Sequence, residues 1–192
     1  MNSAFNPIKR IIHHDESFPI NHYFCNSSHN TYLIEHQLYG TPTFEGYERA
    51  LEQGCRCLEI DCWDGKDEPV VTHGRTFCLN LGFEALIRDL QPLAFKYSEY
   101  PLCLSLEMHC SRKKRDMIAS VLKKYFPTEL FYLTKEDYFS GQLPPLEQLK
   151  NKVLIKCKSK YPTFVTSKLN SNNKITPKRK GHLYNKVRPM AF

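Results

Sequence analysis

The segment 56–62 constrains the fold most strongly, because its pattern predicts a strand with two buried faces. Successive side chains of a strand point to opposite faces, so Glu59 and Asp61 share one face with neighbouring cysteines. The opposite face carries apolar side chains: Leu58, Ile60 and Cys62. These apolar residues argue against a solvent-facing edge strand. Burial on both faces is typical of a parallel sheet that is covered by helices.

Short apolar runs alternate with helical patterns along the chain, which is the pattern of βα units. Extended segments are expected at 22–25, 56–62, 69–71, 102–107 and 153–155, and helices at 43–54, 83–97 and 111–127. Thr43 and Ser111 are the expected N-caps, and the second helix is expected to kink at Pro92. The sequence therefore predicts an α/β fold with about four parallel strands and three helices.

The chain has 192 residues, whereas a complete eight-stranded α/β barrel takes about 250. Hydrophobic residues make up 41% and charged residues 24%, which fits a globular protein and excludes disordered and collagen-like classes. No run of 18 apolar residues predicts a transmembrane segment, and charged residues interrupt the region where a signal peptide would be apolar. The expected location is the cytoplasm.

The formal net charge of +7 is a property of the C-terminal segment. Residues 159–192 hold eight of the 27 basic residues and none of the 20 acidic ones. We expect a lead-in at 1–17, a folded unit at 18–158 and a flexible basic tail at 159–192. A solvated extension is the favoured interpretation of the tail, ahead of binding to anionic lipid, and no nucleic-acid partner is expected.

Polar side chains follow three predicted strands at their carboxyl ends. Two like charges on one strand face repel each other unless a cation or an acid–base role compensates. Asn30, Glu59, Asp61 and Glu107 are expected to converge at this edge, where α/β active sites form. Their oxygen atoms suit Ca²⁺ or Mg²⁺. A zinc site that combines two cysteines with a histidine is a weaker alternative, involving Cys55 and Cys57.

Two histidines and two lysines lie near the same edge. His29 and His73 together with the carboxylates indicate metal-assisted phosphoryl chemistry, although a single histidine is more often structural. Lys156 and Lys158 lie two residues apart after the last strand and could bind phosphate groups as point charges, or could be ordinary exposed lysines.

Five runs along the chain carry a resemblance to a known family. They are HYFCNSSHNTYL, GCRCLEIDCWDG, VVTHGRTF, LSLEMHC and LEQLKNKVLIKCK, in this order over residues 18–160. Together they closely resemble the X region of eukaryotic phosphoinositide-specific phospholipase C. The resemblance implies the first half of a (β/α)8 barrel of the TIM type.

The resemblance also implies roles for the candidate residues. His29 and His73 would be the catalytic histidines, and Glu59 a candidate general base. Asn30, Glu59, Asp61 and Glu107 would be Ca²⁺ ligands, and Lys156 and Lys158 would contact the ring phosphates of the inositol headgroup. The implied reaction cleaves phosphatidylinositol 4,5-bisphosphate at a membrane surface into diacylglycerol and inositol 1,4,5-trisphosphate.

The chain departs from the family pattern in three places. Met108 stands where family members commonly have Asn, and the turn between Asp61 and His73 is one residue shorter than a common form. The second barrel half, the Y region, is not recognised in this sequence. We therefore expect either an enzyme half that needs a Y-region-containing chain, or a catalytically deficient lipid-binding or regulatory fragment.

Overall fold

The computed structural model describes residues 15–34, 36, 38–74, 76–133 and 141–157. The predicted basic tail, Lys158 and most of the predicted lead-in lie outside these residues. No helix within the described ranges is long and apolar enough to cross a membrane.

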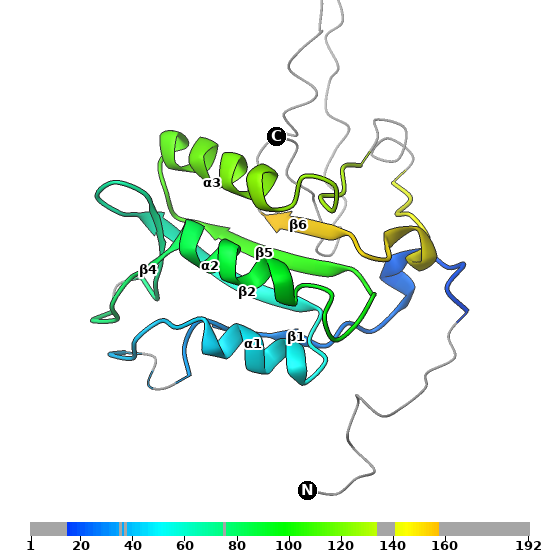
Figure 1. Cartoon of the computed structure of the whole chain (residues 1–192), viewed down its shortest axis with the longest axis horizontal. Helices are drawn as coiled ribbons and strands as arrows, with labels where there is room; N and C mark the ends of the chain where they lie inside the picture. Colours follow the sequence, from blue (N-terminus) through cyan, green and yellow to red (C-terminus); the bar gives the residue numbers. More distant parts are fainter. Residues whose placement is uncertain (1–14, 35, 37, 75, 134–140, 158–192) are drawn as a thin grey trace, which may run out of the picture.

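A mixed sheet forms the centre of the molecule (Figure 1). Four strands in it run parallel in the order β1 (Ser27–Ser28), β2 (Cys57–Asp64), β5 (Leu102–Met108) and β6 (Val153–Cys157). Four parallel strands are therefore present, and the chain is confirmed as α/β.

Two short antiparallel strands extend the sheet on the edge of β2 that β5 does not use. β3 (Pro69–Val71) pairs with the last residues of β2, and β4 (Leu81–Gly82) pairs with β3. β1 pairs only with Cys57 and Leu58, so β1 and β3 occupy successive parts of this one edge.

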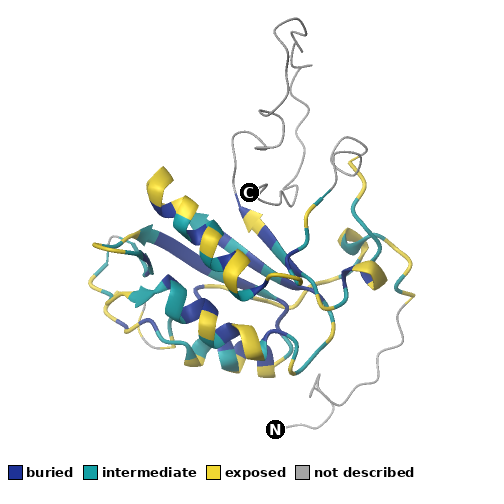
Figure 2. Ribbon diagram, turned by 45° about the horizontal axis from the view of Figure 1, so that its top comes forward, coloured by how far each residue is buried: buried dark blue, intermediate teal, exposed yellow. Residues whose placement is uncertain are grey.

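Three helices pack on one side of the sheet, as Figure 1 shows. They are α1 (Glu45–Glu52), α2 (Phe83–Leu90) and α3 (Arg112–Tyr125). Along each helix the buried residues lie mostly on the side toward the strands and the exposed residues on the outer side (Figure 2). Three short 3-10 turns complete the described elements: Ile20–His22, Gln91–Leu93 and Leu146–Leu149.

The prediction of a strand at 22–25 is wrong. His22 ends a 3-10 turn, the side chain of Phe24 is fully exposed, and the first pairing with β2 is Ser27 to Cys57. The aromatic run has the composition of a strand, but the register with β2 places the pairing further along the chain. Local composition does not specify that register.

Two helix boundaries also differ from the prediction. Phe44 rather than Thr43 is the N-cap of α1, and the Thr43 hydroxyl is buried without a hydrogen-bond partner. α2 ends at Leu90 and continues as the turn that contains Pro92, so the proline marks a change of helix type rather than a kink in one long helix. Ser111 is the N-cap of α3 as predicted, but its hydroxyl bonds Asp64.

A buried arginine connects the beginning of β2 to the segment before β5. The guanidinium of Arg56 donates to the backbone carbonyls of Ala94, Tyr100 and Pro101 at 2.8, 2.7 and 3.4 Å. Burial lowers the pKa of Arg56 to about 10. These bonds tie β2 to the segment that leads into β5. Because both strands carry candidate site residues, the bonds help to hold those residues in position.

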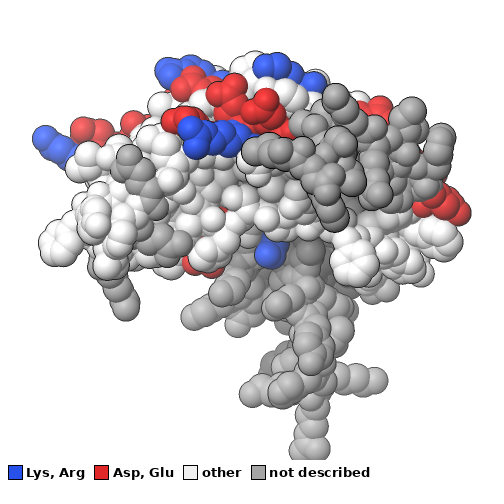
Figure 3. Space-filling view, turned by 90° about the horizontal axis from the view of Figure 1, so that it is seen from below, with Lys and Arg blue, Asp and Glu red and all other residues white. Residues whose placement is uncertain are grey.

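Charged side chains are unevenly distributed over the face that Figure 3 shows. On the face in Figure 3, acidic and basic side chains gather together along one border, and the rest of the described surface in this view is largely uncharged. This face therefore presents no continuous basic patch over its described residues.

Candidate active site

Parallel pairing of β2 and β5 places the candidate carboxylates on one face of the sheet. Glu59 is the register partner of Ser105, and Asp61 is the register partner of Glu107. Side chains two residues apart point the same way, so all four lie on the side opposite the apolar face of β2. The register thus places the three carboxylates on one face of two neighbouring strands.

The loop after β1 brings His29 and Asn30 to Glu59. Asn30 has a left-handed backbone with φ of 47°, and its backbone N–H donates to Glu59 Oε2 at 2.8 Å. His29 Nε2 lies 3.6 Å from the same oxygen, and the His29 side chain is 78% exposed. The loop therefore presents an accessible imidazole beside a partly buried carboxylate.

Tyr32 connects two of the candidate ligands. Its fully buried hydroxyl lies 2.7 Å from Asp61 Oδ2 and 3.1 Å from Asn30 Oδ1. Burial raises the pKa of Tyr32, and burial also raises the pKa of Asp61, which the hydrogen bond from Tyr32 opposes. The tyrosine thus fixes an amide and a carboxylate that come from different segments.

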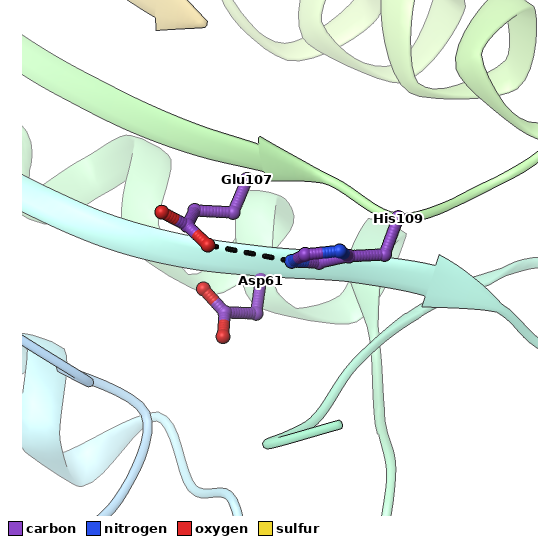
Figure 4. A group of neighbouring side chains, drawn as sticks. All are labelled: Asp61, Glu107 and His109. Carbon is purple, nitrogen blue, oxygen red and sulfur yellow. Dashed lines mark hydrogen bonds and ion pairs between the residues drawn. The ribbon is translucent and has the colours of Figure 1, made fainter. Parts of the chain in front are cut away.

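Asp61 also belongs to a cluster with Glu107 and His109 (Figure 4). One ligand atom of each side chain lies within 4.8 Å of the others, and His109 Nε2 is 3.3 Å from Glu107 Oε2. The second oxygen of Asp61, Oδ1, is buried without a hydrogen-bond partner. An unpartnered buried carboxylate oxygen is unfavourable unless a cation or proton compensates.

The segment that carries His73 lies beside Asp61. The backbone N–H of Thr72 donates to the Asp61 carbonyl at 3.3 Å, and the Thr76 hydroxyl donates to the His73 carbonyl at 2.5 Å. Gly74 packs so closely against Trp63 that an added Cβ would lie 1.8 Å from the indole ring. His29 and His73 thus lie on two different loops, and His73 directly follows the residue whose backbone is bonded to Asp61.

Lys156 lies in the same row of side chains as Glu59. Ser105 is the register partner of both residues, one on each neighbouring strand. Lys156 is exposed and borders a cavity of about 300 Å³ that apolar residues and two half-buried cysteines also line, Cys57 and Cys103. A cationic group is therefore available on the strand next to Glu107 and two strands away from Glu59.

The donor chemistry fits a divalent cation. The side chains of Asn30, Glu59, Asp61 and Glu107 all offer oxygen, and the orphaned Oδ1 of Asp61 is buried among them. Within the described part of the chain, the one group of three or more acidic, histidine or cysteine ligands is the cluster in Figure 4, which contains no cysteine. The alternative zinc site at Cys55 and Cys57 therefore gains no support.

Two residues of this site were not identified from the sequence, Tyr32 and His109. Tyr32 looks like an ordinary core aromatic, and only the fold shows that its hydroxyl joins Asn30 to Asp61. His109 did carry a signal, because it lies two residues after Glu107, one residue beyond the end of β5, and continued alternation places both side chains on the same side.

Known proteins match this chain over nearly all of its described residues. Residues 16–159 match the family model described as phosphatidylinositol-specific phospholipase C, X domain. The 1-phosphatidylinositol 4,5-bisphosphate phosphodiesterase delta-4 of Xenopus laevis is 43% identical over 157 residues, which cover 81% of this chain and 21% of that protein. The zeta-1 protein of Bos taurus is 48% identical over 148 residues, covering 77% of this chain and 23% of the relative.

Solved structures show the same fold. PLC21 of S. officinalis superposes with a TM-score of 0.71 at 39% identity, covering 77% of this chain and 20% of that one. A calcium-dependent phosphoinositol-specific phospholipase C from Pseudomonas sp. superposes with a TM-score of 0.56 at 17% identity, covering 74% of this chain and 59% of the bacterial one. The chain thus spans about a fifth of the length of the eukaryotic relatives it matches.

Proposed function

The chain belongs to the family of phosphatidylinositol-specific phospholipase C X domains, and from this premise we propose that it acts as the first catalytic half of a Ca²⁺-dependent phosphoinositide phospholipase C. The observation that carries the proposal is the approach of His29, Asn30, Glu59, Asp61 and Glu107 at one edge of the sheet. The substrate we propose is phosphatidylinositol 4,5-bisphosphate, with diacylglycerol and inositol 1,4,5-trisphosphate as products.

The proposed architecture is half of a TIM-type barrel at residues 18–158, with a lead-in at 1–17 and a basic tail at 159–192. The parallel order β1–β2–β5–β6 supports this, because consecutive strands of such a barrel are neighbours. On its outer edge, the backbone hydrogen bonds that described residues make to β6 are those of Glu129 and Phe131 with Val153. A Y-region-containing chain would add its strands at this edge and complete the substrate site.

Asn30, Glu59, Asp61 and Glu107 are the residues that would hold Ca²⁺. Their oxygens fit a hard cation, and ligation would satisfy the orphaned Oδ1 of Asp61. Bound Ca²⁺ supplies positive charge beside the reacting phosphate and lowers the pKa of the attacking hydroxyl.

The proposed reaction is attack of the inositol 2-hydroxyl on the 1-phosphate, followed by opening of the cyclic phosphate by water. Glu59 takes the proton of the attacking hydroxyl, and the neighbouring His29 donates hydrogen bonds to the phosphate oxygens. His73, on the other loop, protonates the departing diacylglycerol oxygen. Lys156, and Lys158 outside the described residues, bind ring phosphates and so orient the headgroup.

The test is reconstitution of the two halves. The chain is combined with a Y-region-containing partner on vesicles that contain phosphatidylinositol 4,5-bisphosphate, and release of inositol phosphates is followed during a Ca²⁺ titration. We expect release that depends on Ca²⁺ and on both chains. Absence of release with every partner across the titration would reject the proposed enzyme.

A second candidate is a catalytically deficient fragment that binds lipid or regulates a related enzyme at the cytoplasmic membrane surface. The observation that favours it is that the candidate cation ligands on β2 and β5 and Lys156 on β6 lie within this chain, which supports binding of an anionic headgroup without turnover. Co-sedimentation with phosphoinositide vesicles but no phosphodiesterase activity in the reconstituted assay would select this candidate.

A further inference from the structure

We propose that Asp61, Glu107 and His109 accept a first-row transition-metal divalent ion, with the His109 imidazole as a direct ligand, and that this ion competes with Ca²⁺. The competition rests on the proposed function, because both ions would share Asp61 and Glu107. Binding of the transition metal does not rest on it, since the three side chains are present whether or not the chain has phospholipase activity.

The spacing of His109 and Glu107 fits two ligands of one small ion. Two atoms that are each about 2.1 Å from an ion lie about 3.0–3.4 Å apart when the angle between them is about 90–110°. The observed separation of His109 Nε2 and Glu107 Oε2 is 3.3 Å. Asp61 contributes its oxygen from within 4.8 Å of both, so a small rotation of its side chain completes a three-ligand set.

The buried, unpartnered oxygen of Asp61 indicates that a cation binds at this cluster. The residue is only 7% exposed, and its Oδ1 has no hydrogen-bond partner although its Oδ2 accepts from Tyr32. A buried carboxylate oxygen without a partner is unfavourable and rare in folded proteins. A cation at the cluster satisfies this oxygen, whereas the hydrogen bond between His109 and Glu107 leaves it unsatisfied.

The imidazole of His109 is held toward the cluster. Its ring stacks on Trp63 with centroids 4.4 Å apart and planes 16° apart, and its backbone N–H donates to the Cys62 carbonyl at 2.9 Å. These contacts orient Nε2 toward Glu107 (Figure 4). The side chains of His109 and Glu107 are 38% and 44% exposed, so an ion and its waters can reach the cluster from solvent.

The nitrogen ligand determines the class of ion. Ca²⁺ takes six to eight oxygen ligands, whereas imidazole together with carboxylates suits first-row transition metals. Asn30 and Glu59 lie outside the three-residue cluster. The transition metal would therefore bind Asp61, Glu107 and His109, whereas Ca²⁺ would bind the oxygen atoms of Asn30, Glu59, Asp61 and Glu107. The two ions would therefore overlap at Asp61 and Glu107.

Mn²⁺ is the probe that tests this inference, because it is paramagnetic and binds thiols weakly. The full chain is stripped of metal, titrated with Mn²⁺ and studied by pulsed electron paramagnetic resonance, which detects the ¹⁴N nucleus of a coordinated imidazole. The variants are His109→Gln, which removes the imidazole, and His22→Gln as the matched control in the turn Ile20–His22. We expect ¹⁴N coupling in the native chain and in His22→Gln, and its loss in His109→Gln together with at least tenfold weaker Mn²⁺ binding.

Three outcomes overturn the inference: no ¹⁴N coupling in the native chain, coupling that persists in His109→Gln, or equal Mn²⁺ affinities of the two variants. Zn²⁺ is expected to displace Mn²⁺, since affinity for such sites rises along the first row. Ca²⁺ is also expected to displace it, and failure to do so rejects the competition. Mn²⁺ coupling without phosphodiesterase activity would reject the proposed function alone, and activity without coupling would reject this inference alone.

Discussion

Replacing Tyr32 with phenylalanine tests how the site is held together. The substitution removes one hydroxyl and keeps the buried ring, so packing of the fully buried side chain is preserved. The hydroxyl is within hydrogen-bond distance of Asp61 Oδ2 and Asn30 Oδ1. Its loss leaves both carboxylate oxygens of Asp61 without a hydrogen-bond partner among the described residues.

Two magnitudes follow from these contacts. A hydrogen bond to a charged acceptor contributes about 1.5–3 kcal/mol, so the free energy of unfolding should fall by about that amount in the metal-free chain. Loss of a residue that orients metal ligands typically weakens metal binding about 10–100-fold, and we expect this reduction in Ca²⁺ affinity. A domain is commonly stable by about 5–15 kcal/mol, so the variant should still fold.

Tyr47 provides the matched control for this substitution. It is also fully buried, but its hydroxyl donates to the backbone carbonyl of Glu59 at 2.9 Å rather than to a ligand side chain. Tyr47→Phe should lower the free energy of unfolding by about 0.5–1.5 kcal/mol and leave Ca²⁺ affinity nearly unchanged. Urea unfolding and calorimetric Ca²⁺ titration measure both quantities. Equal Ca²⁺ affinities of the two variants, within twofold, would refute the role of Tyr32.

Three further predictions concern the reaction, Ca²⁺ binding and the stability of the fold. In the reconstituted enzyme, His29→Ala and His73→Ala should each lower the rate about 10²–10⁴-fold, and an unchanged rate would contradict the catalytic role proposed for that histidine. Glu107→Gln should raise the Ca²⁺ concentration needed for half-maximal activity more than it lowers the rate at saturating Ca²⁺; the opposite pattern would argue against ligation. Arg56→Met removes a buried donor to three carbonyls, so the free energy of unfolding should fall by about 2–5 kcal/mol, and a loss below 1 kcal/mol in urea would show that these bonds contribute little.

The sequence predicted those parts of the fold that depend on local periodicity. Alternation along 56–62 placed Glu59 and Asp61 on one face, and the structure gives the same arrangement on β2. The predicted first helix, 43–54, ends at a glycine, and Gly54 adopts a φ of 83° just after α1. These features depend on backbone geometry within a few residues, so one sequence is enough to predict them.

Features that depend on pairing between distant segments could not be predicted in this way. The first strand is at Ser27–Ser28 because the register with β2 begins there, and no local pattern encodes that register. The contact between Tyr32 and Asp61 and the cluster at His109 both require β2, β5 and the loop after β1 to be assembled. The candidate ligands were therefore predictable by type, whereas the residues that orient them were not.

The divided edge of β2 has a consequence for how the loops of this fold can change in length. Between the parts taken by β1 and β3, the backbone of β2 is bonded by the Thr31 hydroxyl, which accepts from the Glu59 N–H, and by the Thr72 N–H, which donates to Asp61. An insertion at 29–31 would move Asn30 away from Glu59, so this loop has a fixed length. The tip of the β2–β3 hairpin, at Gly65–Glu68, is closed by its own hydrogen bond, from the Gly65 N–H to the Glu68 carbonyl at 3.1 Å. A surface turn of this kind can gain or lose residues with little effect on the site. The hairpin tip is therefore the place to attach a tag or spectroscopic label.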